Sequence, residues 1–287
     1  MDFKKATLGD RGEIEKYLNM TKKPSLEYSF TTLYLWQEQY GMEFCIEDGF
    51  LFIRTSGKRS MYLFPMGAGD ERTAVDKIVQ KGGVFYSLSR EQAEKIDKWY
   101  PDRYTFAESR DMGDYVYETQ SLATLKGKKL SAKRNHINRF VAENPDWSYE
   151  EITRDNIDEI KAMHQEWLSL QDNQNELETE TVAVKIALSE YFSLGFSGGA
   201  IRTGGRIVAF SIGDKLSDST FLVHIEKAFS AYSGAYQLIN REFVQRNCMD
   251  FEFVNREDDA GDEGLRKAKL SYRPHHIVTK FMAKPRA

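Results

Sequence analysis

The chain has 287 residues, which suits two domains or one large domain, and with 41% hydrophobic and 29% charged residues its composition excludes collagen, disordered and minimal disulfide-stapled proteins. Its 40 basic and 44 acidic residues give a net charge of −4, which excludes a protein that coats nucleic acid over its whole surface. The sequence therefore predicts a globular protein in which any site for a polyanion is local.

The sequence contains no recognisable export or membrane segment. Charges are spread through Met1–Leu18, and no run of about 18 apolar residues occurs. The two cysteines, Cys45 and Cys248, lie in different halves and belong to no metal or redox motif, so we expect two buried thiols and no metal site. These features favour a cytoplasmic protein.

The first half alternates helical and strand patterns. A helix is expected over residues 30–41, and the alternating stretch 44–54 turns at Asp48-Gly49, a strong signal for a hairpin. Further helices are expected near 71–80 and 89–100, and further strands near 82–88 and 103–109.

The second half repeats this alternation more regularly. A helix over 178–194 is followed by a hairpin, 198–216, that turns at Gly204-Gly205. The remaining pattern predicts strands at 220–228, 250–257 and 275–283, and helices at 236–248 and 264–272. Mixed α/β layers are the expected result.

A weak internal repeat relates the two halves. Residues 3–18 align with residues 149–164, and in both copies a short strand, a polar turn and a helix precede another helix and a hairpin. The identical pairs are Thr7 with Thr153, Glu13 with Glu159, and Ile14 with Ile160. We therefore expect two domains of similar fold, at residues 1–118 and 119–287.

A basic segment lies between the halves. Residues 125–140 hold six Lys or Arg side chains and His136 but no Asp or Glu. The segment is either a solvated connector or a site for a phosphate-rich ligand, such as a tRNA end, a cofactor pyrophosphate or an anionic lipid head group. In a helix, Arg134 and Asn138 would be neighbours able to hold one group.

The strand at 220–228 carries two ionisable side chains. Strict alternation places His224 and Glu226 on one sheet face, where the carboxylate acts as a general base or where both simply face solvent. The following Ser233-Gly234-Ala235 begins a helix whose first amides would bind phosphate or an oxyanion.

A third charged cluster follows the strand that ends near residue 255. Arg256, Asp258 and Asp259 precede a helix that carries Arg266 and Lys269 on one face. The two aspartates are either a Mg²⁺ site or, more in keeping with the neighbouring cations, members of an ion-pair network. Either arrangement marks a candidate catalytic region at a strand end.

These motifs resemble a bacterial family of soluble proteins related to the C-terminal catalytic domain of phosphatidylglycerol lysyltransferase. The resemblance lies in residues 114–140, 221–243 and 254–274, and in the first half in 27–36 and 62–70. It implies tandem acetyltransferase-like (GNAT) domains, akin to the Fem-type transferases that use aminoacyl-tRNA as the donor. In the lysyltransferases the aminoacyl group passes to the glycerol hydroxyl of an anionic lipid.

The resemblance also implies which residues form the site. The family pattern near the donor matches Gly264, Leu265, Arg266, Lys269, Tyr272 and Pro274, and its other polar signatures match His224, Glu226, Lys227, Asn255, Arg256 and Glu257. Two departures stand out. The multi-span membrane region of the lysyltransferases has no counterpart in this sequence, and the acetyl-CoA phosphate motif keeps only Gly234.

The resulting prediction is an acyltransferase without a tightly bound cofactor. Its donor is aminoacyl-tRNA, and its acceptor is an amine or hydroxyl of a small molecule, a peptide or a lipid head group. An acyl-CoA-dependent N-acetyltransferase and a non-catalytic module that binds tRNA or another anionic ligand are the alternatives.

The expected roles follow the residue chemistry. Glu226, helped by His224, deprotonates the nucleophile, while Lys269, Arg266 and the amides around Gly234 stabilise the oxyanion and the donor phosphates. The polyanionic donor is held by the remaining cations of these motifs, which are Lys133, Arg134, Arg139, Lys227 and Arg256.

Overall fold

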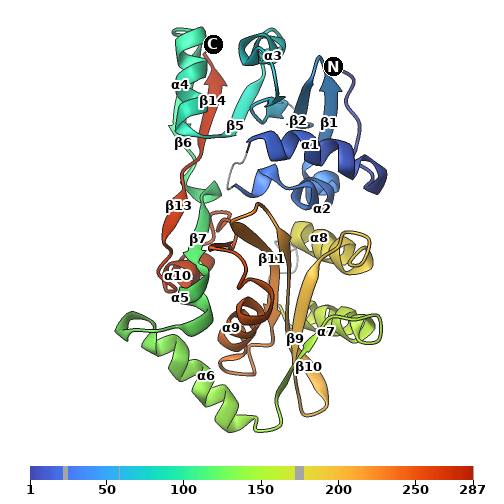
Figure 1. The fold of residues 1–287 in the computed structure, drawn as a ribbon, viewed down its shortest axis with the longest axis vertical. Helices are drawn as coiled ribbons and strands as arrows, with labels where there is room; N and C mark the ends of the chain where they lie inside the picture. The colour runs from blue at the N-terminus through green and yellow to red at the C-terminus, as the bar shows by residue number, and fades with distance from the viewer. Residues whose placement is uncertain (22–24, 58, 172–177, 287) are drawn as a thin grey trace. The chain divides into compact units, whose positions relative to one another are not determined.

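The computed structural model describes residues 1–21, 25–57, 59–171 and 178–286. The chain divides into two compact units, each with its own mixed sheet (Figure 1). The first unit comprises Met1–Asp114, Asp258–Gly261 and Val278–Ala287, and the second comprises Tyr115–Glu257 and Asp262–Ile277. The predicted fold class, mixed α/β, is confirmed.

The sheet of the first unit has the strand order β1-β2-β3-β5-β14-β6, with β4 paired to β2. Its strands are β1 (Met42–Glu47), β2 (Phe50–Thr55), β3 (Met61–Tyr62), β4 (Met66–Gly67), β5 (Val84–Leu88), β6 (Tyr104–Glu108) and β14 (Phe281–Pro285). Its α-helices are α1 (Arg11–Thr21), α2 (Phe30–Tyr40), α3 (Glu71–Val79) and α4 (Arg90–Trp99). The hairpin predicted at Asp48-Gly49 joins β1 to β2.

The sheet of the second unit has the order β13-β7-β12-β11-β10-β9-β8. Its strands are β7 (Asp114–Glu118), β8 (Ser148–Glu151), β9 (Ser197–Thr203), β10 (Arg206–Lys215), β11 (Thr220–Ala228), β12 (Phe253–Asn255) and β13 (His276–Val278). Its α-helices are α5 (Thr119–Thr124), α6 (Ser131–Glu143), α7 (Ile157–Ser169), α8 (Glu178–Ser189), α9 (Ala235–Asn247) and α10 (Glu263–Leu270).

The two sheets repeat one pattern. Three antiparallel strands, β1 to β3 or β9 to β11, are followed by a strand parallel to the third, which is β5 or β12. A helix precedes that parallel strand in each unit, α3 in the first and α9 in the second. The first strand of each set also has an antiparallel neighbour on its outer side. In the first unit Lys4 forms a bridge to Phe44 of β1, and in the second unit β8 pairs with β9. This agreement supports the internal repeat seen in the sequence.

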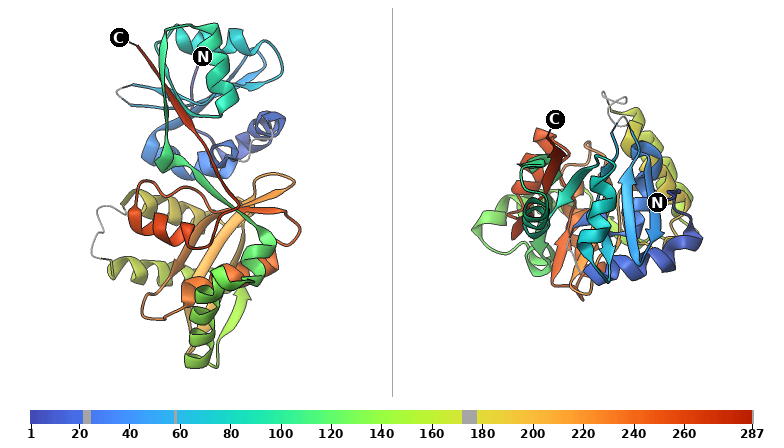
Figure 2. Two further views of the ribbon diagram at one scale, coloured as in Figure 1. Left: turned by 90° about the vertical axis from the view of Figure 1, so that its left-hand side faces the viewer. Right: turned by 90° about the horizontal axis from the view of Figure 1, so that it is seen from above.

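One strand of each sheet comes from an unexpected part of the chain. In the first unit β14, from the end of the chain, lies between β5 and β6 (Figure 1), and Figure 2 follows this strand, in dark red, to the C-terminus. In the second unit β7 lies between β12 and β13. The single strand expected at 275–283 is thus two strands in two sheets, and the last residues lie outside the expected 119–287 unit.

Helix α9 covers one face of the second sheet, while α7 and α8 lie on the other (Figure 1). Its apolar residues recur at helical spacing, and Leu238, Ile239, Phe243 and Val244 are all buried. The Phe243 ring packs edge-on against Phe221 of β11, with centroids 5.8 Å apart. Burial of this stripe holds α9 against the sheet.

A β-bulge interrupts β11 at His224. Ile212 of β10 pairs with Ile225, but the next residue, Gly213, pairs with Val223, so His224 is the extra residue. Strict alternation fails beyond a bulge, because one residue is skipped. Glu226 consequently reaches Asn240 of α9, on the face that also holds Phe221. The prediction that His224 and Glu226 lie on the same face of the sheet is therefore wrong.

Two further sequence-based expectations can be compared with the structure. Cys45 and Cys248 are buried free thiols, as predicted. Over the described ranges, no helix is both long and apolar enough to cross a bilayer.

Candidate functional site

Glu226 and Arg256 form the centre of a polar cluster in the second unit. A guanidinium nitrogen of Arg256, Nη2, donates to Glu226 Oε1 over 2.8 Å, and Asn240 Nδ2 donates to Glu226 Oε2 over 2.9 Å. Both charged side chains are 11% exposed. β11 supplies the carboxylate, α9 the amide, and the turn after β12 the guanidinium. The parallel pairing of β11 with β12 covers Thr220–Leu222 and Phe253–Asn255, so both charges lie just beyond it.

Two tyrosines and a lysine surround this ion pair. The Arg256 guanidinium lies 4.9 Å from the centroid of the Tyr272 ring, and Lys133 Nζ lies 4.1 Å from the same centroid. Burial, reinforced by the charge of Arg256, lowers the pKa of Lys133. Tyr117 packs edge-on against Tyr272, and burial raises the pKa of both phenols. The cluster therefore combines one carboxylate with two cations held on an aromatic wall.

Three buried polar atoms near Glu226 have no hydrogen-bond partner among the residues that the structure describes. They are Ser211 Oγ, Asn240 Oδ1 and Arg256 Nη1. Ser211 and Asn240 are 0% and 1% exposed, and Ser211 lies directly across the β10–β11 pair from Glu226. Because a buried polar group without a partner costs about 1 to 3 kcal/mol, such a concentration marks a place for a polar ligand.

Sequence reasoning missed Ser211 and Asn240. The available signals were a serine within the apolar run 207–212 and an asparagine within the apolar stripe of α9. Both residue types are common in ordinary strands and helices, so neither signal pointed to a site.

His224 is fully engaged elsewhere. Its Nε2 and Nδ1 lie 2.9 Å from Asp214 and Glu257, respectively, and its side chain is 2% exposed. Burial opposes protonation of the ring, but the two carboxylates outweigh burial and raise the pKa of His224 to about 10. An imidazolium with both nitrogens bonded cannot take a proton from a nucleophile. The geometry therefore does not provide the predicted help to Glu226.

Lys269 contacts the backbone of the turn that carries Arg256. Its Nζ donates to the backbone carbonyl of Arg256 over 2.6 Å, and the residue is 8% exposed. Tyr117 in turn donates to the carbonyl of Lys269. Lys269 thus supports the turn that carries Arg256, while Arg266 lies half-buried on the same helix, α10.

The basic segment divides between the site and the surface. Lys133 reaches the Tyr272 ring, whereas Arg134 donates to the backbone carbonyls of Leu125 and Gly127. Arg139 is 64% exposed and pairs with Glu143 on its own helix. The structure therefore brings one of the three predicted donor-binding cations of α6 to the cluster and leaves the other two outside it.

Lys227 and Gly234, which were also predicted to bind the aminoacyl donor, both make close contacts within the protein. Lys227 is buried, pairs with Glu180 over 2.7 Å and lies over the Trp167 ring. Gly234 has φ of 94°, and a Cβ there would lie 2.2 Å from the carbonyl oxygen of His136. Glycine is thus required where α6 meets the start of α9, and the amide of Ala235 already donates to Tyr232. The Ala235 amide is therefore engaged within the protein.

One of the aspartates after β12 belongs to an ion pair. Asp259 is fully buried and pairs with Arg110, at 3.3 Å, rather than with Arg256. Across the described residues, no group of three or more His, Cys, Asp or Glu side chains is arranged to hold a metal ion.

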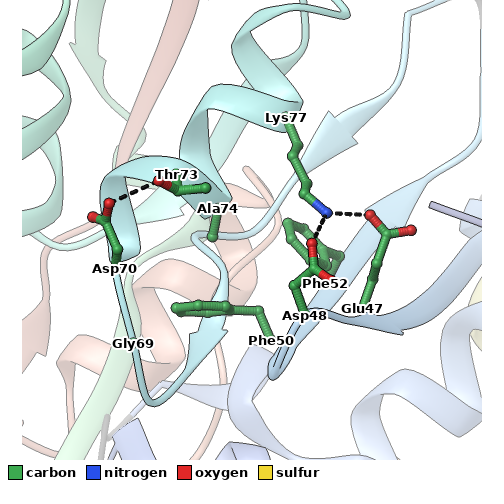
Figure 3. Close-up of a pocket in the computed structure, with 9 residues that line it drawn as sticks. All are labelled: Glu47, Asp48, Phe50, Phe52, Gly69, Asp70, Thr73, Ala74 and Lys77. Carbon is green, nitrogen blue, oxygen red and sulfur yellow. Dashed lines mark hydrogen bonds and ion pairs between the residues drawn. The ribbon is translucent and has the colours of Figure 1, made fainter.

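A separate cavity of about 230 Å³ lies in the first unit (Figure 3). Phe50, Phe52 and Ala74 supply apolar lining. Figure 3 shows Lys77 between Glu47 and Asp48, and Asp70 beside Thr73. These charged groups satisfy one another, so the cavity presents no activated group comparable to those around Glu226.

His164 gives the second unit an acid-sensitive element. The ring is 2% exposed between Trp167 and Phe210, and both nitrogens are without partners in the described chain. Burial, helped by Lys227, lowers the pKa of His164 to about 4. Between pH 6.5 and 4 the unfolded chain therefore binds more protons than the folded chain, so stability falls as pH falls through this window.

Replacing His164 with phenylalanine is expected to remove this pH dependence. Between pH 7 and 4.5 the wild type should lose about 2 to 3 kcal/mol more unfolding free energy than His164→Phe, because only the wild type must keep an imidazole neutral. Guanidinium unfolding followed by circular dichroism at both pH values measures the difference, with His136→Gln as the exposed control. Equal losses in both proteins would contradict the assignment.

Sequence comparison places most of the chain in one family. Residues 19–284 match the family model described as phosphatidylglycerol lysyltransferase, C-terminal. An uncharacterised protein of Mycoplasmoides gallisepticum is 25% identical over 175 residues, which is 60% of this chain and 56% of that protein. The chain thus spans little more than half of this relative's length.

Solved structures show the same fold. A conserved protein of unknown function from Bacteroides thetaiotaomicron is 37% identical over the whole of both chains, with a TM-score of 0.93. The structure of L-PGS from Bacillus licheniformis is 16% identical, with a TM-score of 0.64 over 96% of this chain and 91% of that one, which shows a shared fold. The chain belongs to the family of the phosphatidylglycerol lysyltransferase C-terminal domain.

Proposed function

We propose that this protein transfers an aminoacyl group from aminoacyl-tRNA to an amine or hydroxyl acceptor. The main support is the group of unpartnered polar atoms around Glu226. Arg256 Nη1 offers an N–H donor, and Asn240 Oδ1 offers an acceptor. An aminoacyl ester has a carbonyl oxygen that could accept a hydrogen bond from Arg256 Nη1. It also has an α-ammonium group that could donate to Asn240 Oδ1, and an acetyl group lacks this ammonium.

The proposed chemistry uses three charged side chains. Glu226 takes the proton of the attacking amine or hydroxyl as the new bond to the carbonyl carbon forms. Arg256 and Lys133 stabilise the negative charge that develops on the carbonyl oxygen. When the intermediate collapses, the bond to the ribose oxygen breaks, and that oxygen takes the proton back from Glu226. No oxidant, reductant or metal is needed for this sequence.

The exposed part of the basic segment suits a polyanionic donor. Lys126, Lys128 and Lys129 are exposed just before α6, the helix that carries Lys133 to the cluster. Such cations attract phosphates and make binding sensitive to salt. An amine and a hydroxyl acceptor would each give up one proton to Glu226, so the proposal covers both classes.

Incubation with radiolabelled donors tests the proposal. A pool of tRNA charged with labelled amino acids, or labelled acetyl-CoA, is mixed with the protein and a cell extract, and the products are separated by chromatography. We expect protein-dependent loss of label from tRNA and its appearance in an acceptor. Consumption of acetyl-CoA alone, or salt-sensitive tRNA binding without consumption, would overturn the proposal.

A further inference from the structure

The turn that presents Arg256 has a strained backbone. Glu257 has φ of 57°, in the left-handed region, where a residue other than glycine is strained. Its backbone N–H donates to Asn255 Oδ1 over 2.8 Å, and its carbonyl accepts from the N–H of Tyr115. A conformation of this kind persists only where its surroundings hold it, so the contacts of Glu257 decide where Arg256 lies.

The side chain of Glu257 is anchored by His224. Glu257 Oε1 lies 2.9 Å from His224 Nδ1, and the opposite nitrogen of the ring lies 2.9 Å from Asp214 of β10. The imidazole therefore bridges the central sheet and the turn after β12. It lies at the bulge of β11, two residues before Glu226 along the chain.

We propose that His224 is a positioning residue, which acts through Glu257 to hold the Arg256 guanidinium against Glu226. Lys269 also holds this turn, because its Nζ donates to the backbone carbonyl of Arg256. This inference deepens the proposed function and depends on it for the effect on rate. In the proposed mechanism neither His224 nor Glu257 takes part in the chemistry, so their loss is expected to change the placement of Arg256 rather than the reaction that it supports.

A pair of variants at Glu257 separates positioning from general stability. Glu257→Gly removes the carboxylate and accepts the positive φ without strain, but it leaves the buried His224 ring with one carboxylate partner instead of two, so circular dichroism must first show that the variant is folded at the assay temperature. We expect kcat to fall by about 10- to 100-fold with little change in the KM for the donor. Glu257→Gln retains an oxygen that accepts from His224 and should stay within about threefold of wild type.

A matched control tests the effect of glycine itself. Ala260 also has a positive φ, 46°, and is exposed, so Ala260→Gly introduces the same residue without touching the contact between Glu257 and His224. Its kcat should equal that of the wild type. Wild-type kcat in Glu257→Gly as well would overturn the inference.

A second readout does not depend on activity. The guanidinium protons of Arg256 exchange slowly while they are buried and paired, and ¹⁵N-arginine NMR measures their exchange, with Arg256→Lys used to assign the signal. Exchange should be at least about tenfold faster in Glu257→Gly and close to wild type in Glu257→Gln. Unchanged exchange in Glu257→Gly overturns the positioning role. A wild-type protein that transfers no label would overturn the proposed function alone, because the exchange rates would still decide the role of His224.

Discussion

Glu226→Gln is expected to lower the rate of aminoacyl transfer by about 100- to 10,000-fold. Glutamine keeps an oxygen for the Arg256 guanidinium but cannot take a proton from the acceptor. The KM for the donor should change little, because the exposed lysines before α6 and the side chain of Lys133 remain. Single-turnover rates at saturating aminoacyl-tRNA measure the chemical step directly, without a contribution from product release.

The charge change requires its own control. Arg256 is left without its carboxylate in Glu226→Gln, so circular dichroism must first show that the variant is folded at the assay temperature. Glu252→Gln removes an exposed carboxylate in the same unit and should transfer at the wild-type rate. If Glu226→Gln transferred as fast as Glu252→Gln, Glu226 would not be the base.

Local signals predicted most of the fold. The hairpins at Asp48-Gly49 and Gly204-Gly205 were identified because turn residues interrupt alternating strands, and both appear in the structure. The insertion of β14 and β7 into the sheets was not predicted. Which strands pair is decided by contacts between distant parts of the chain, and β14 meets both β5 and β6 from more than 170 residues away.

Prediction of the candidate site was limited in the same way, because contacts between distant residues decide which side chains meet. The sequence singled out Glu226 on a strand, Arg256 in a charged cluster after a strand and Lys133 in a basic segment, and the structure brings these three side chains together. It did not separate Lys133 from its neighbours Arg134 and Arg139, since charge alone does not tell which side of α6 faces the rest of the unit. One extra residue at His224 also reversed the expected faces, and a bulge has no reliable sequence signal.

Lys280→Met is expected to destabilise the first unit by about 3 to 5 kcal/mol. Lys280 is 1% exposed, and its Nζ donates to Glu27 over 2.7 Å and to Asp114 over 2.6 Å. Both carboxylates are also buried, and they accept further bonds from Ser25, Ser87 and the N–H of Leu26. Methionine fills a similar volume but removes the buried cation that the two carboxylates share.

The pH dependence of this loss follows from the direction of the pKa shifts. Burial favours the neutral form of Glu27, but the charge of Lys280 outweighs it and lowers the pKa of Glu27 in the wild type. This contribution to stability is present above the ordinary pKa of a glutamate and is lost as pH falls below it. Without Lys280 the carboxyls should take up protons in the folded state, so the destabilisation should be smaller at pH 4.5 than at pH 7.

Hydrogen exchange of the β14 and β5 amides measures the effect within the first unit alone. At pH 7 protection in Lys280→Met should fall by about two to four orders of magnitude, since each factor of ten corresponds to about 1.4 kcal/mol. Lys284→Met changes an exposed lysine of β14 and should keep wild-type protection. Adding Glu27→Gln and Asp114→Asn to Lys280→Met should restore much of the loss, because the uncompensated charges are then removed. Protection in Lys280→Met equal to that in Lys284→Met would show that the buried cation is not what holds the last strand in this sheet.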